Sequence, residues 1–366
     1  MSGSAALAQF EILRNPQPLP DAERAAILEN PGFGRFFTDH MVTVRYAEGK
    51  GWHDARIEPF GPLSLSPATA VLHYAQEIFE GMKAYSRPDG SVGLFRPWEN
   101  ARRFQRSAQR MAMPELPEEL FLASLEAILS IDREWIPTTE DSSLYLRPFM
   151  FASEAFLGVR PSLEYIYGVI ASPAGAYFKA GPKPVNMWVS QEYTRAAPGG
   201  TGAAKCGGNY ATSLLPQAEA AKHGCEQVVF LDAVHRKYVD ELGGMNVFFV
   251  YGEEKRVITP ELGTILPGIT RDAVITLAQE KGYEVIERRY GIDEWKADAA
   301  SGALTEVFAC GTAAVVTPIG NVSDHTGSFP ASGGVAGPLT MDLRSALLAI
   351  QYGEAEDVHG WTTTVG

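Results

Sequence analysis

Apolar residues follow two different periods along the first half of the chain. Residues 41–46 alternate apolar and polar side chains, and residues 165–171 are rich in aromatic and β-branched residues, so both segments predict strands. Over residues 100–113 and 117–131, apolar side chains recur every three or four positions, which predicts two helices. Pro117 suits the first turn of the second helix, where a missing N–H breaks no hydrogen bond.

The second half alternates predicted strands with predicted helices. Short apolar runs predict strands at 185–190, 227–231, 246–251 and 284–289, and helical periods predict helices at 209–223, 268–281 and 339–352. Pro216 lies inside the first of these helices and is expected to kink it or to remove a hydrogen bond. Strands and helices in both halves together predict a mixed α/β (α+β) fold.

Residues 172–184 divide the two halves. Proline, glycine and alanine crowd this segment and interrupt both periods. A chain of 366 residues also exceeds what one compact domain usually holds, so two domains are expected. The predicted N-terminal domain covers 1–177, the interdomain loop covers 178–184, and the C-terminal domain covers 185–366.

Composition narrows the possible functions. A net charge of −13 disfavours nucleic acid as a partner, because its phosphates would be repelled. The sequence has no run of eighteen apolar residues and no basic start leading into an apolar segment, which predicts a cytoplasmic protein without a membrane partner. The cysteines at 206, 225 and 310 lack metal-ligand spacing, so we expect no metal site and three small buried side chains in a reducing compartment.

The segment Lys205-Cys206-Gly207-Gly208-Asn209-Tyr210, with Glu241 downstream, carries the candidate chemistry. The two glycines let the backbone approach a flat ring, while Lys205, Tyr210 and Glu241 supply an amine, a phenol and a carboxylate. This combination suits pyridoxal phosphate, since the amine can bond to the cofactor and the carboxylate can keep its ring nitrogen protonated. From composition alone, an exposed lysine, a helix-face aromatic residue and a solvated acid are the simpler interpretations.

Further motifs follow one another along nearly the whole chain. They are Phe36-Phe37-Thr38-Asp39-His40-Met41, Leu72-His73-Tyr74, Phe79-Glu80-Gly81-Met82-Lys83-Ala84, Phe95-Arg96-Pro97-Trp98-Glu99-Asn100, Leu144-Tyr145-Leu146-Arg147-Pro148, Leu266-Pro267-Gly268-Ile269-Thr270-Arg271 and Gly311-Thr312-Ala313. In this order they resemble the branched-chain amino acid aminotransferases, which belong to the fold type IV class of pyridoxal phosphate enzymes. The resemblance implies that the chain transfers the amino group of leucine, isoleucine or valine to 2-oxoglutarate, in the biosynthesis or breakdown of these amino acids. It also implies a homodimer of two-domain subunits, with the cofactor between a smaller N-terminal and a larger C-terminal domain.

The same resemblance assigns roles residue by residue. Lys205 is the catalytic residue and bonds to pyridoxal 5'-phosphate. The other cofactor contacts come from Arg103, Tyr210, Glu241, Ile269, Thr270 and Thr312. The substrate contacts come from Phe33, Tyr74, Phe79, Tyr145, Arg147, Tyr177, Thr312 and Ala313. Leu157 and Val159 resemble residues that close the pocket of the neighbouring subunit.

Simple geometry is consistent with three of these assignments. A helix turns the adjacent Arg102 and Arg103 about 100° apart, so only one of them can point inward. Tyr145 and Arg147 are two residues apart, which places them on the same face of a strand. Residues 268–270 open a helix, whose first N–H groups attract anions such as phosphate. The aromatic residues could instead be ordinary core, and Arg147 could pair with an acid.

The sequence departs from vertebrate members of the family in two places. Ala314 and Thr317 stand where those members have two cysteines, so thiol switching is impossible there. Vertebrate members have threonine where this chain has Gly244, and in this respect the chain resembles bacterial, particularly actinobacterial, members. D-amino acid aminotransferases and aminodeoxychorismate lyases share the lysine and the glutamate, but usually lack the segment Phe95-Arg96-Pro97-Trp98. The other alternative is a protein that binds the cofactor without turnover.

Overall fold

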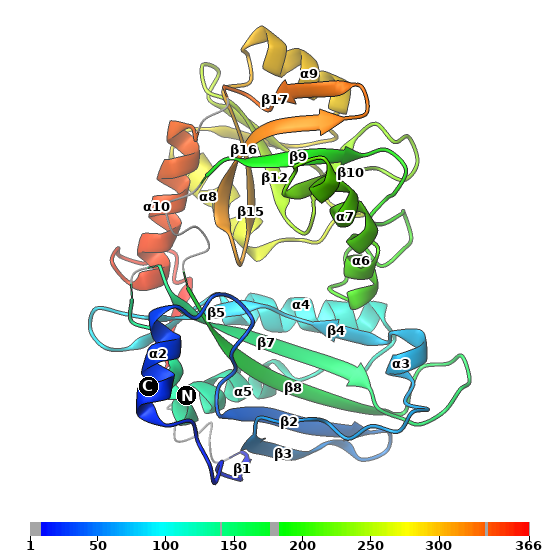
Figure 1. Ribbon diagram of the computed structural model, residues 1–366, viewed down its shortest axis with the longest axis vertical. Coiled ribbons are helices and arrows are strands. Elements are labelled where there is room, and N and C mark those ends of the chain that lie inside the picture. Colours follow the sequence, from blue (N-terminus) through cyan, green and yellow to red (C-terminus); the bar gives the residue numbers. More distant parts are fainter. Residues whose placement is uncertain (1–8, 140, 176–182, 334–335, 366) are drawn as a thin grey trace. The chain divides into compact units, whose positions relative to one another are not determined.

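The computed structural model describes residues 9–139, 141–175, 183–333 and 336–365. The chain divides into two compact units, each with its own sheet (Figure 1). The first unit consists of Met1–Tyr177, Ala204–Gly207 and Ala349–Gly366, and the second consists of Phe178–Ala203 and Gly208–Leu348. The mixed α/β fold class predicted from the sequence is confirmed.

The sheet of the first unit has the order β1-β3-β2-β8-β7-β5-β6-β18, and β4 pairs with β7 outside this path. Its strands are β1 (Glu11–Ile12), β2 (His40–Ala47), β3 (Gly51–Pro59), β4 (Glu77–Phe79), β5 (Met82–Ser86), β6 (Val92–Phe95), β7 (Ser143–Ala152), β8 (Glu164–Ala174) and β18 (Thr362–Val365). The strands predicted at 41–46 and 165–171 are therefore confirmed as β2 and β8. Among the described pairs of this sheet, β1 and β3 run parallel and the others run antiparallel.

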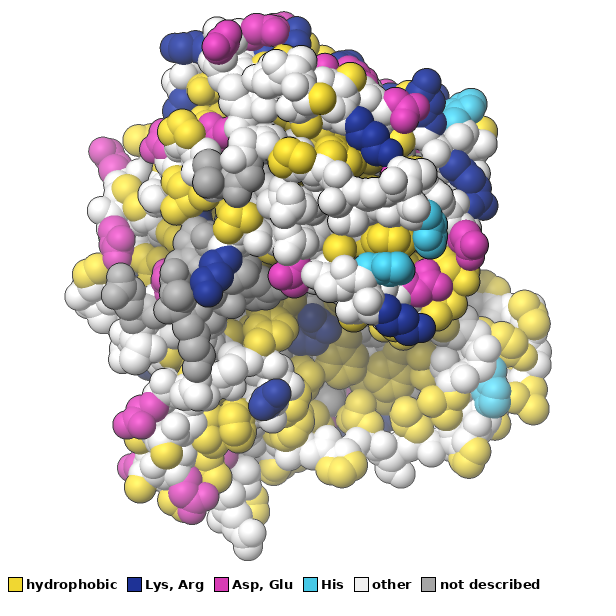
Figure 2. Space-filling model, turned by 45° about the horizontal axis from the view of Figure 1, so that its top comes forward, with side chains coloured by type: hydrophobic (Ala, Val, Ile, Leu, Met, Phe, Trp, Pro, Cys, Tyr) yellow, Lys and Arg dark blue, Asp and Glu magenta, His cyan; other side chains and the backbone are white. Residues whose placement is uncertain are grey.

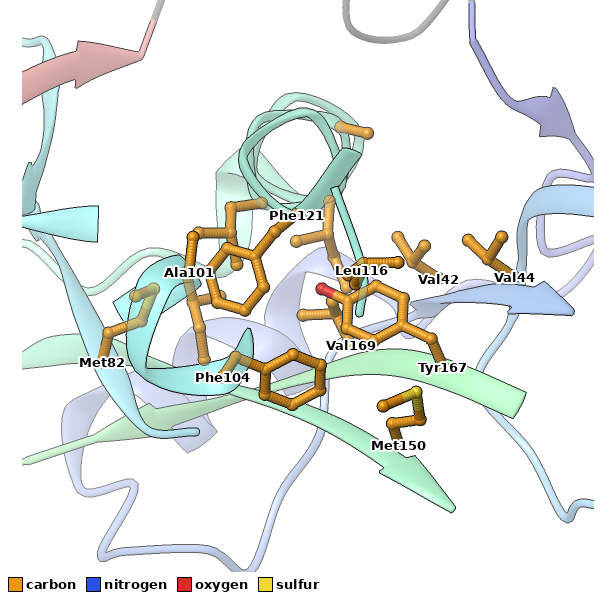
Figure 3. Close-up of a cluster of buried hydrophobic side chains, with 14 of the residues drawn as sticks. Val42, Val44, Met82, Ala101, Phe104, Leu116, Phe121, Met150, Tyr167 and Val169 are labelled. Atoms are coloured by element: carbon orange, nitrogen blue, oxygen red, sulfur yellow. The ribbon is translucent and has the colours of Figure 1, made fainter. Parts of the chain in front are cut away.

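Two helices build the core of the first unit with this sheet. They are α4 (Pro97–Arg110) and α5 (Glu118–Ile131), which confirm the helices predicted at 100–113 and 117–131. Phe104 of α4, Phe121 of α5 and Tyr167 of β8 meet in a buried aromatic cluster (Figure 3). Pro117 is the N-cap of α5, immediately before the first helical residue. The unit also contains α2 (Asp21–Glu29), α3 (Val71–Tyr74) and the 3₁₀ turn η1 (Arg133–Trp135).

The sheet of the second unit has the order β11-β10-β9-β16-β15-β12-β13-β14, and β17 pairs with β16. Its strands are β9 (Val185–Ser190), β10 (Gln227–Leu231), β11 (Val239–Leu242), β12 (Asn246–Tyr251), β13 (Arg256–Thr259), β14 (Glu284–Glu287), β15 (Glu306–Gly311), β16 (Val315–Asp324) and β17 (Gly327–Pro330). The helices are α6 (Gly207–Ala211), α7 (Leu214–Lys222), α8 (Ile269–Glu280), α9 (Ile292–Ser301) and α10 (Pro338–Tyr352). The four strands predicted in this half, and the helices at 268–281 and 339–352, are confirmed.

The prediction made for Pro216 is wrong. The predicted helix 209–223 is divided into α6 and α7, and Pro216 is the third residue of α7 rather than a kink. An N–H in the first helical turn has no intrahelical acceptor, so proline costs no hydrogen bond there. The strand predicted at 165–171 extends further than expected, because β8 continues through Pro173 and pairs with β7 as far as Ala174.

The two units do not follow the order of the sequence. Residues 204–207 and 349–366 group with the first unit although their neighbours in sequence group with the second. The domain limits 1–177 and 185–366 stay a prediction, and most of the predicted loop 178–184 lies outside the described residues.

No helix within the described part of the chain is long and apolar enough to cross a membrane. In Figure 2, acidic and basic side chains are interspersed on the visible face, and hydrophobic side chains gather on the first unit.

Candidate active site

The backbone around Lys205 is fixed within the first unit by β4 and α4. The N–H of Phe79 donates to the carbonyl of Lys205 over 3.0 Å. The N–H of Lys205 in turn donates to Ser107 Oγ, also over 3.0 Å. Two residues later, the N–H of Gly207 donates to Glu77 Oε1. The three contacts hold the lysine segment against one strand and one helix, so the position of the Lys205 side chain is set by rigid elements.

The surroundings of Lys205 favour the neutral amine. Burial lowers the pKa of Lys205 from 10.5 to about 8, with a further lowering by the positive charge of Arg103. Glu80 and Tyr145 act in the opposite direction, but they do not cancel the effect of burial. Relative to a lysine of ordinary pKa, roughly 300-fold more of this amine is neutral at pH 7. Neutral amine is the form that attacks a carbonyl and accepts a proton.

We expect acylation of Lys205 in the cofactor-free protein to rise with pH around a midpoint near 8, the pKa of the amine. Arg103→Met should raise this midpoint, because a positive neighbour that disfavours the ammonium form is lost. Peptide-level mass spectrometry after brief acylation at each pH measures the midpoint. Arg102→Met is the matched control, since Arg102 is exposed and pairs with Glu99 and Glu118. A midpoint at the ordinary value of a lysine in the unmodified protein would contradict the prediction. So would equal midpoints in the Arg103→Met and Arg102→Met variants.

Arg103 is held by a buried ion pair that the sequence reasoning did not assign. Its Nε and Nη2 donate to the two carboxylate oxygens of Glu80, each over 2.8 Å, and Asn100 Nδ2 donates to the same carboxylate over 2.7 Å. Burial alone would raise the pKa of Glu80, but Arg103, with smaller contributions from Lys205 and Asn100, holds the pKa below the ordinary value. Arg103 points inward and Arg102 outward, as their angular separation requires. Arg103 and Ser107 lie four residues apart on α4, on one helix face.

Aromatic residues and one arginine lie beside this lysine in the first unit. The Lys205 Nζ and the Arg147 guanidinium lie 5.0 Å and 4.7 Å from the centre of the Phe79 ring. Arg147 Nη2 donates to the Tyr145 hydroxyl over 3.1 Å, and the Tyr145 ring meets the Phe33 ring edge-on at 5.1 Å. Arg147 Nε is buried, and no described residue accepts its hydrogen bond. The group therefore offers an apolar wall with a cation that still has one donor to satisfy.

The remaining predicted substrate residues lie elsewhere. Tyr74, on α3, donates its hydroxyl to the carbonyl of Leu157. The side chains of Leu157 and Val159 are 64% and 89% exposed. Tyr74 therefore groups with the two residues expected to face a second subunit. Tyr177 lies outside the described residues.

Glu241 is buried on β11 in the second unit, with a partner for each oxygen. Arg195 Nε lies 2.7 Å from Oε2, and the N–H of Leu266 donates to Oε1 over 2.9 Å. Both members of the ion pair are almost fully buried. Neutralising this carboxylate would leave a buried guanidinium without its counter-charge. Arg195 is a second residue that the sequence reasoning missed.

The other predicted cofactor residues of the second unit lie at a helix start, in a turn and in a short helix. Ile269 and Thr270 begin α8, after Gly268, and the structure gives this helix no side-chain cap. A Cβ on Gly268 would come within 2.1 Å of Asn246 Oδ1, so a larger residue at this helix start would require the Asn246 side chain to move. Thr312 and Ala313 form part of the turn between β15 and β16, and Tyr210 lies in α6. The role of each residue stays a prediction.

The contacts that sequence reasoning missed share one property. Glu77, Glu80, Ser107 and Arg195 act on a residue of the predicted site rather than on a ligand. Glu80 stands inside the family motif that starts at Phe79, so this motif could have indicated that Glu80 belongs to the site. The others had no signal, since their partners are distant in sequence or are backbone groups.

Three comparisons with known proteins agree with one another. Residues 77–322 match the amino-transferase class IV family. The chain is 58% identical to a probable branched-chain-amino-acid aminotransferase of Streptomyces coelicolor, over 97% of this chain and 98% of the relative. It is 56% identical to the branched-chain-amino-acid aminotransferase of Mycobacterium tuberculosis, with 98% of each chain covered.

The structural neighbours are members of the same family. The branched-chain amino acid aminotransferase of Escherichia coli matches with a TM-score of 0.71 and 30% identity, over 88% of this chain and 99% of the neighbour. The branched-chain amino acid aminotransferase of Thermobaculum terrenum, in its PLP-form, matches with a TM-score of 0.70 and 27% identity, over 89% and 98% of the two chains. The predicted fold type is therefore confirmed. The chain belongs to the class IV aminotransferases and, within them, to the branched-chain-amino-acid aminotransferases.

Proposed function

We propose that the protein transfers the amino group of L-leucine, L-isoleucine or L-valine to 2-oxoglutarate, with pyridoxal 5'-phosphate as cofactor. The names of relatives that match over nearly the whole chain support the reaction class. The observation that carries the proposal is the buried Lys205 with a pKa of about 8, fixed by its backbone beside Arg103 and an aromatic wall. An amine of this kind is suited to covalent and proton-transfer chemistry near neutral pH.

The described residues fit pyridoxal 5'-phosphate by the chemistry of their donors. Lys205 offers an amine with a lowered pKa, and Glu241 offers a buried, ion-paired carboxylate for a ring nitrogen. Tyr210 would meet the ring hydroxyl oxygen. Arg103, the start of α8 at Ile269 and Thr270, and the Thr312 hydroxyl would hold the phosphate. When bound, the cofactor supplies an electron sink that stabilises negative charge at the substrate Cα.

The residues of the chain then have separate tasks. Lys205 Nζ, as a neutral amine, takes the proton from the substrate Cα and returns a proton in its ammonium form. Glu241, fixed by Arg195, would accept a hydrogen bond from a protonated ring nitrogen and favour that protonated state. The N–H groups of Thr312 and Ala313 would bind the substrate carboxylate. Since every substrate carries this carboxylate, these two N–H groups serve both halves of the reaction.

One pocket has to accept both leucine and glutamate. Phe33, Phe79 and Tyr145 offer apolar surface to an aliphatic side chain. The guanidinium of Arg147 lies against two of these rings, and its buried Nε lacks an acceptor among the described residues. A distal carboxylate of glutamate or 2-oxoglutarate can supply that acceptor through a charge-assisted hydrogen bond.

We expect Arg147→Met to weaken the glutamate and 2-oxoglutarate half-reaction far more than the leucine half-reaction. A hydrogen bond to a charged group contributes roughly 2 to 3 kcal/mol, so the loss for the charged substrates should be roughly 30- to 150-fold. Methionine keeps the unbranched apolar stem that a leucine side chain contacts. Single-turnover spectroscopy of each half-reaction measures the two effects separately, and equal losses in both halves would show that Arg147 is structural.

We also propose that the enzyme is a homodimer that works in the cytoplasm. Leu157 and Val159 support the first part, because both expose apolar side chains that a second subunit would cover. The three cysteines, all buried and outside disulfides, suit a reducing compartment. Sedimentation velocity at micromolar concentration tests the dimer, and a monomer under assay conditions would contradict it.

The function is tested by incubating the purified protein with pyridoxal 5'-phosphate, an amino acid and 2-oxoglutarate, and measuring glutamate. L-leucine, L-isoleucine and L-valine should give glutamate, and D-alanine should not. Glutamate formed from D-alanine alone would favour a D-amino acid aminotransferase. Cofactor binding without any glutamate would show a protein that binds the cofactor and does not turn over.

A further inference from the structure

A valine at the start of β16, directly after the turn from β15, occupies a backbone conformation that valine rarely adopts. Gly311 pairs with Val315 across the two strands, and the intervening residues make the turn. Val315 has a φ of +61°, in the left-handed region, and its side chain is buried. Turns of this length usually place glycine at the left-handed position, because a Cβ, and above all a branched one, is strained there. A strained residue persists only where its surroundings hold it.

Arg344 of α10 holds this conformation from both sides. Its Nη1 donates to the carbonyl of Ala314 over 2.9 Å and to the carbonyl of Val316 over 3.1 Å. The Ala314 carbonyl belongs to the peptide group directly before Val315, and the Val316 carbonyl belongs to the peptide group after Val316. One guanidinium nitrogen therefore ties together the chain before and after the strained residue. The Thr317 hydroxyl also donates to the Ala314 carbonyl, over 3.3 Å. Rotation of Val315 toward an ordinary conformation would turn at least one carbonyl away from Arg344.

The choice of valine has a physical consequence. Glycine would adopt the left-handed conformation without strain, but it would also leave that conformation easily. Valine has few alternatives once its side chain is buried and the Ala314 and Val316 carbonyls are bound. The pair of Val315 and Arg344 therefore gives a more rigid turn than glycine alone would.

We propose that Arg344 is a positioning residue that fixes the direction of the Thr312 and Ala313 N–H groups by holding Val315 in its left-handed conformation. The proposal rests on the proposed function, which assigns the substrate carboxylate to those N–H groups. Arg344 acts through the turn and touches no reacting atom. Its effect is common to all substrates, since leucine and 2-oxoglutarate carry the same carboxylate next to the reacting carbon. The effect of Arg147, by contrast, is confined to substrates with a second carboxylate.

The test replaces Arg344 by methionine in the cofactor-loaded enzyme. We expect KM for L-leucine and for 2-oxoglutarate to rise together by about tenfold, the effect of losing a hydrogen bond of ordinary strength, with kcat changed much less. Equilibrium binding of 4-methylpentanoate, a carboxylic acid shaped like leucine but without its amine, should weaken by the same factor. This binding measurement does not depend on turnover. Arg344→Gln keeps one amide donor, so its KM values and its affinity for 4-methylpentanoate should lie between those of the unmodified enzyme and those of Arg344→Met. This variant replaces Arg344→Met in the test if the methionine variant does not fold.

Arg236→Met is the matched control. Arg236 Nη1 also bridges two backbone carbonyls of the second unit, those of Gln191 and Glu192, over 2.7 and 2.8 Å. Its loss removes the same kind of contact away from the turn, so it can lower the melting temperature but should leave KM and 4-methylpentanoate binding unchanged. Equal rises in KM for Arg236→Met and Arg344→Met would overturn the proposal.

A double-mutant cycle shows whether Arg344 acts through Val315. In a Val315→Gly background the left-handed conformation needs no support, so adding Arg344→Met should weaken 4-methylpentanoate binding much less than in the original chain. An equal effect in both backgrounds, or normal binding in a folded Arg344→Met variant, would overturn the proposal. If the unmodified protein forms no glutamate from any of the three amino acids, the proposed function is wrong. That result differs from failure of the Arg344 proposal, which requires an active unmodified enzyme with the binding results just described.

Discussion

We expect Lys205→Ala to lower the transamination rate by roughly 10⁴-fold or more, because one amine performs both the covalent and the proton-transfer steps. The methyl group of alanine cannot bond to a cofactor or accept a proton. The fold should survive, since the backbone contacts of residue 205 with Phe79 and Ser107 use no side-chain atom of the lysine. Cofactor content, circular dichroism and the rate with L-leucine, measured on the same preparation, separate loss of chemistry from loss of structure.

Lys237→Ala is the matched control for this prediction. Lys237 is exposed on the segment between β10 and β11, and its replacement should leave the rate unchanged. Borohydride reduction of the unmodified enzyme, followed by peptide mapping, should find the cofactor on Lys205. A reduced adduct on Lys83 or Lys237, or near-normal turnover of Lys205→Ala, would contradict the assignment.

Glu241→Gln is expected to lower turnover by roughly 30- to 150-fold at full cofactor occupancy. A neutral amide cannot hold a ring nitrogen in its protonated state, and the charge-assisted hydrogen bond it replaces contributes roughly 2 to 3 kcal/mol. The same change leaves the buried guanidinium of Arg195 without its counter-charge, so the melting temperature should fall as well. Steady-state rates at saturating cofactor, with the bound cofactor quantified, measure the first effect, and thermal unfolding measures the second.

Asp240→Asn is the matched control, because Asp240 neighbours Glu241 on β11 and points to the opposite face. Burial raises the pKa of Asp240 to about 6, so its carboxyl gains a proton more easily than an ordinary aspartate and an amide is a mild replacement. The Thr264 hydroxyl, which donates to Asp240 over 3.2 Å, can donate to the amide oxygen. Turnover should stay normal. An unchanged rate for Glu241→Gln would show that the ring nitrogen has another partner.

Helix and strand geometry made part of the site predictable. Because a helix separates adjacent residues by a fixed angle, at most one of Arg102 and Arg103 could point inward. The family resemblance selected Arg103, and the structure buries it. The period of two along β7 likewise places Tyr145 and Arg147 together, with Leu144 and Leu146 buried on the other face. Such features depend on local periods that are visible in any sequence.

Other features depended on partners that a sequence does not reveal. Arg195 contacts Glu241 and Arg344 contacts the carbonyls beside Val315, and neither pairing follows from spacing. A backbone carbonyl leaves no signal in the sequence, since every residue has one. The position of Pro216 was misjudged for a related reason. Whether proline breaks or begins a helix depends on where the helix starts, and the break before α7 was not foreseen.

The strand β18 bears on how the protein is made. Thr362–Val365 forms β18 and pairs with Val92–Phe95, and the N–H of Arg96 donates to the carbonyl of Trp361. A ribosome releases the partner strand β6 long before it adds these residues. Until β18 is added, β6 is the edge strand of the first sheet, and its unpaired backbone groups can pair with another nascent chain. In the finished fold, β18 takes the edge position instead. Substitutions that weaken β18 should therefore lower the yield and increase aggregation during expression. Substitutions on the exposed surface of the helices should have a smaller effect.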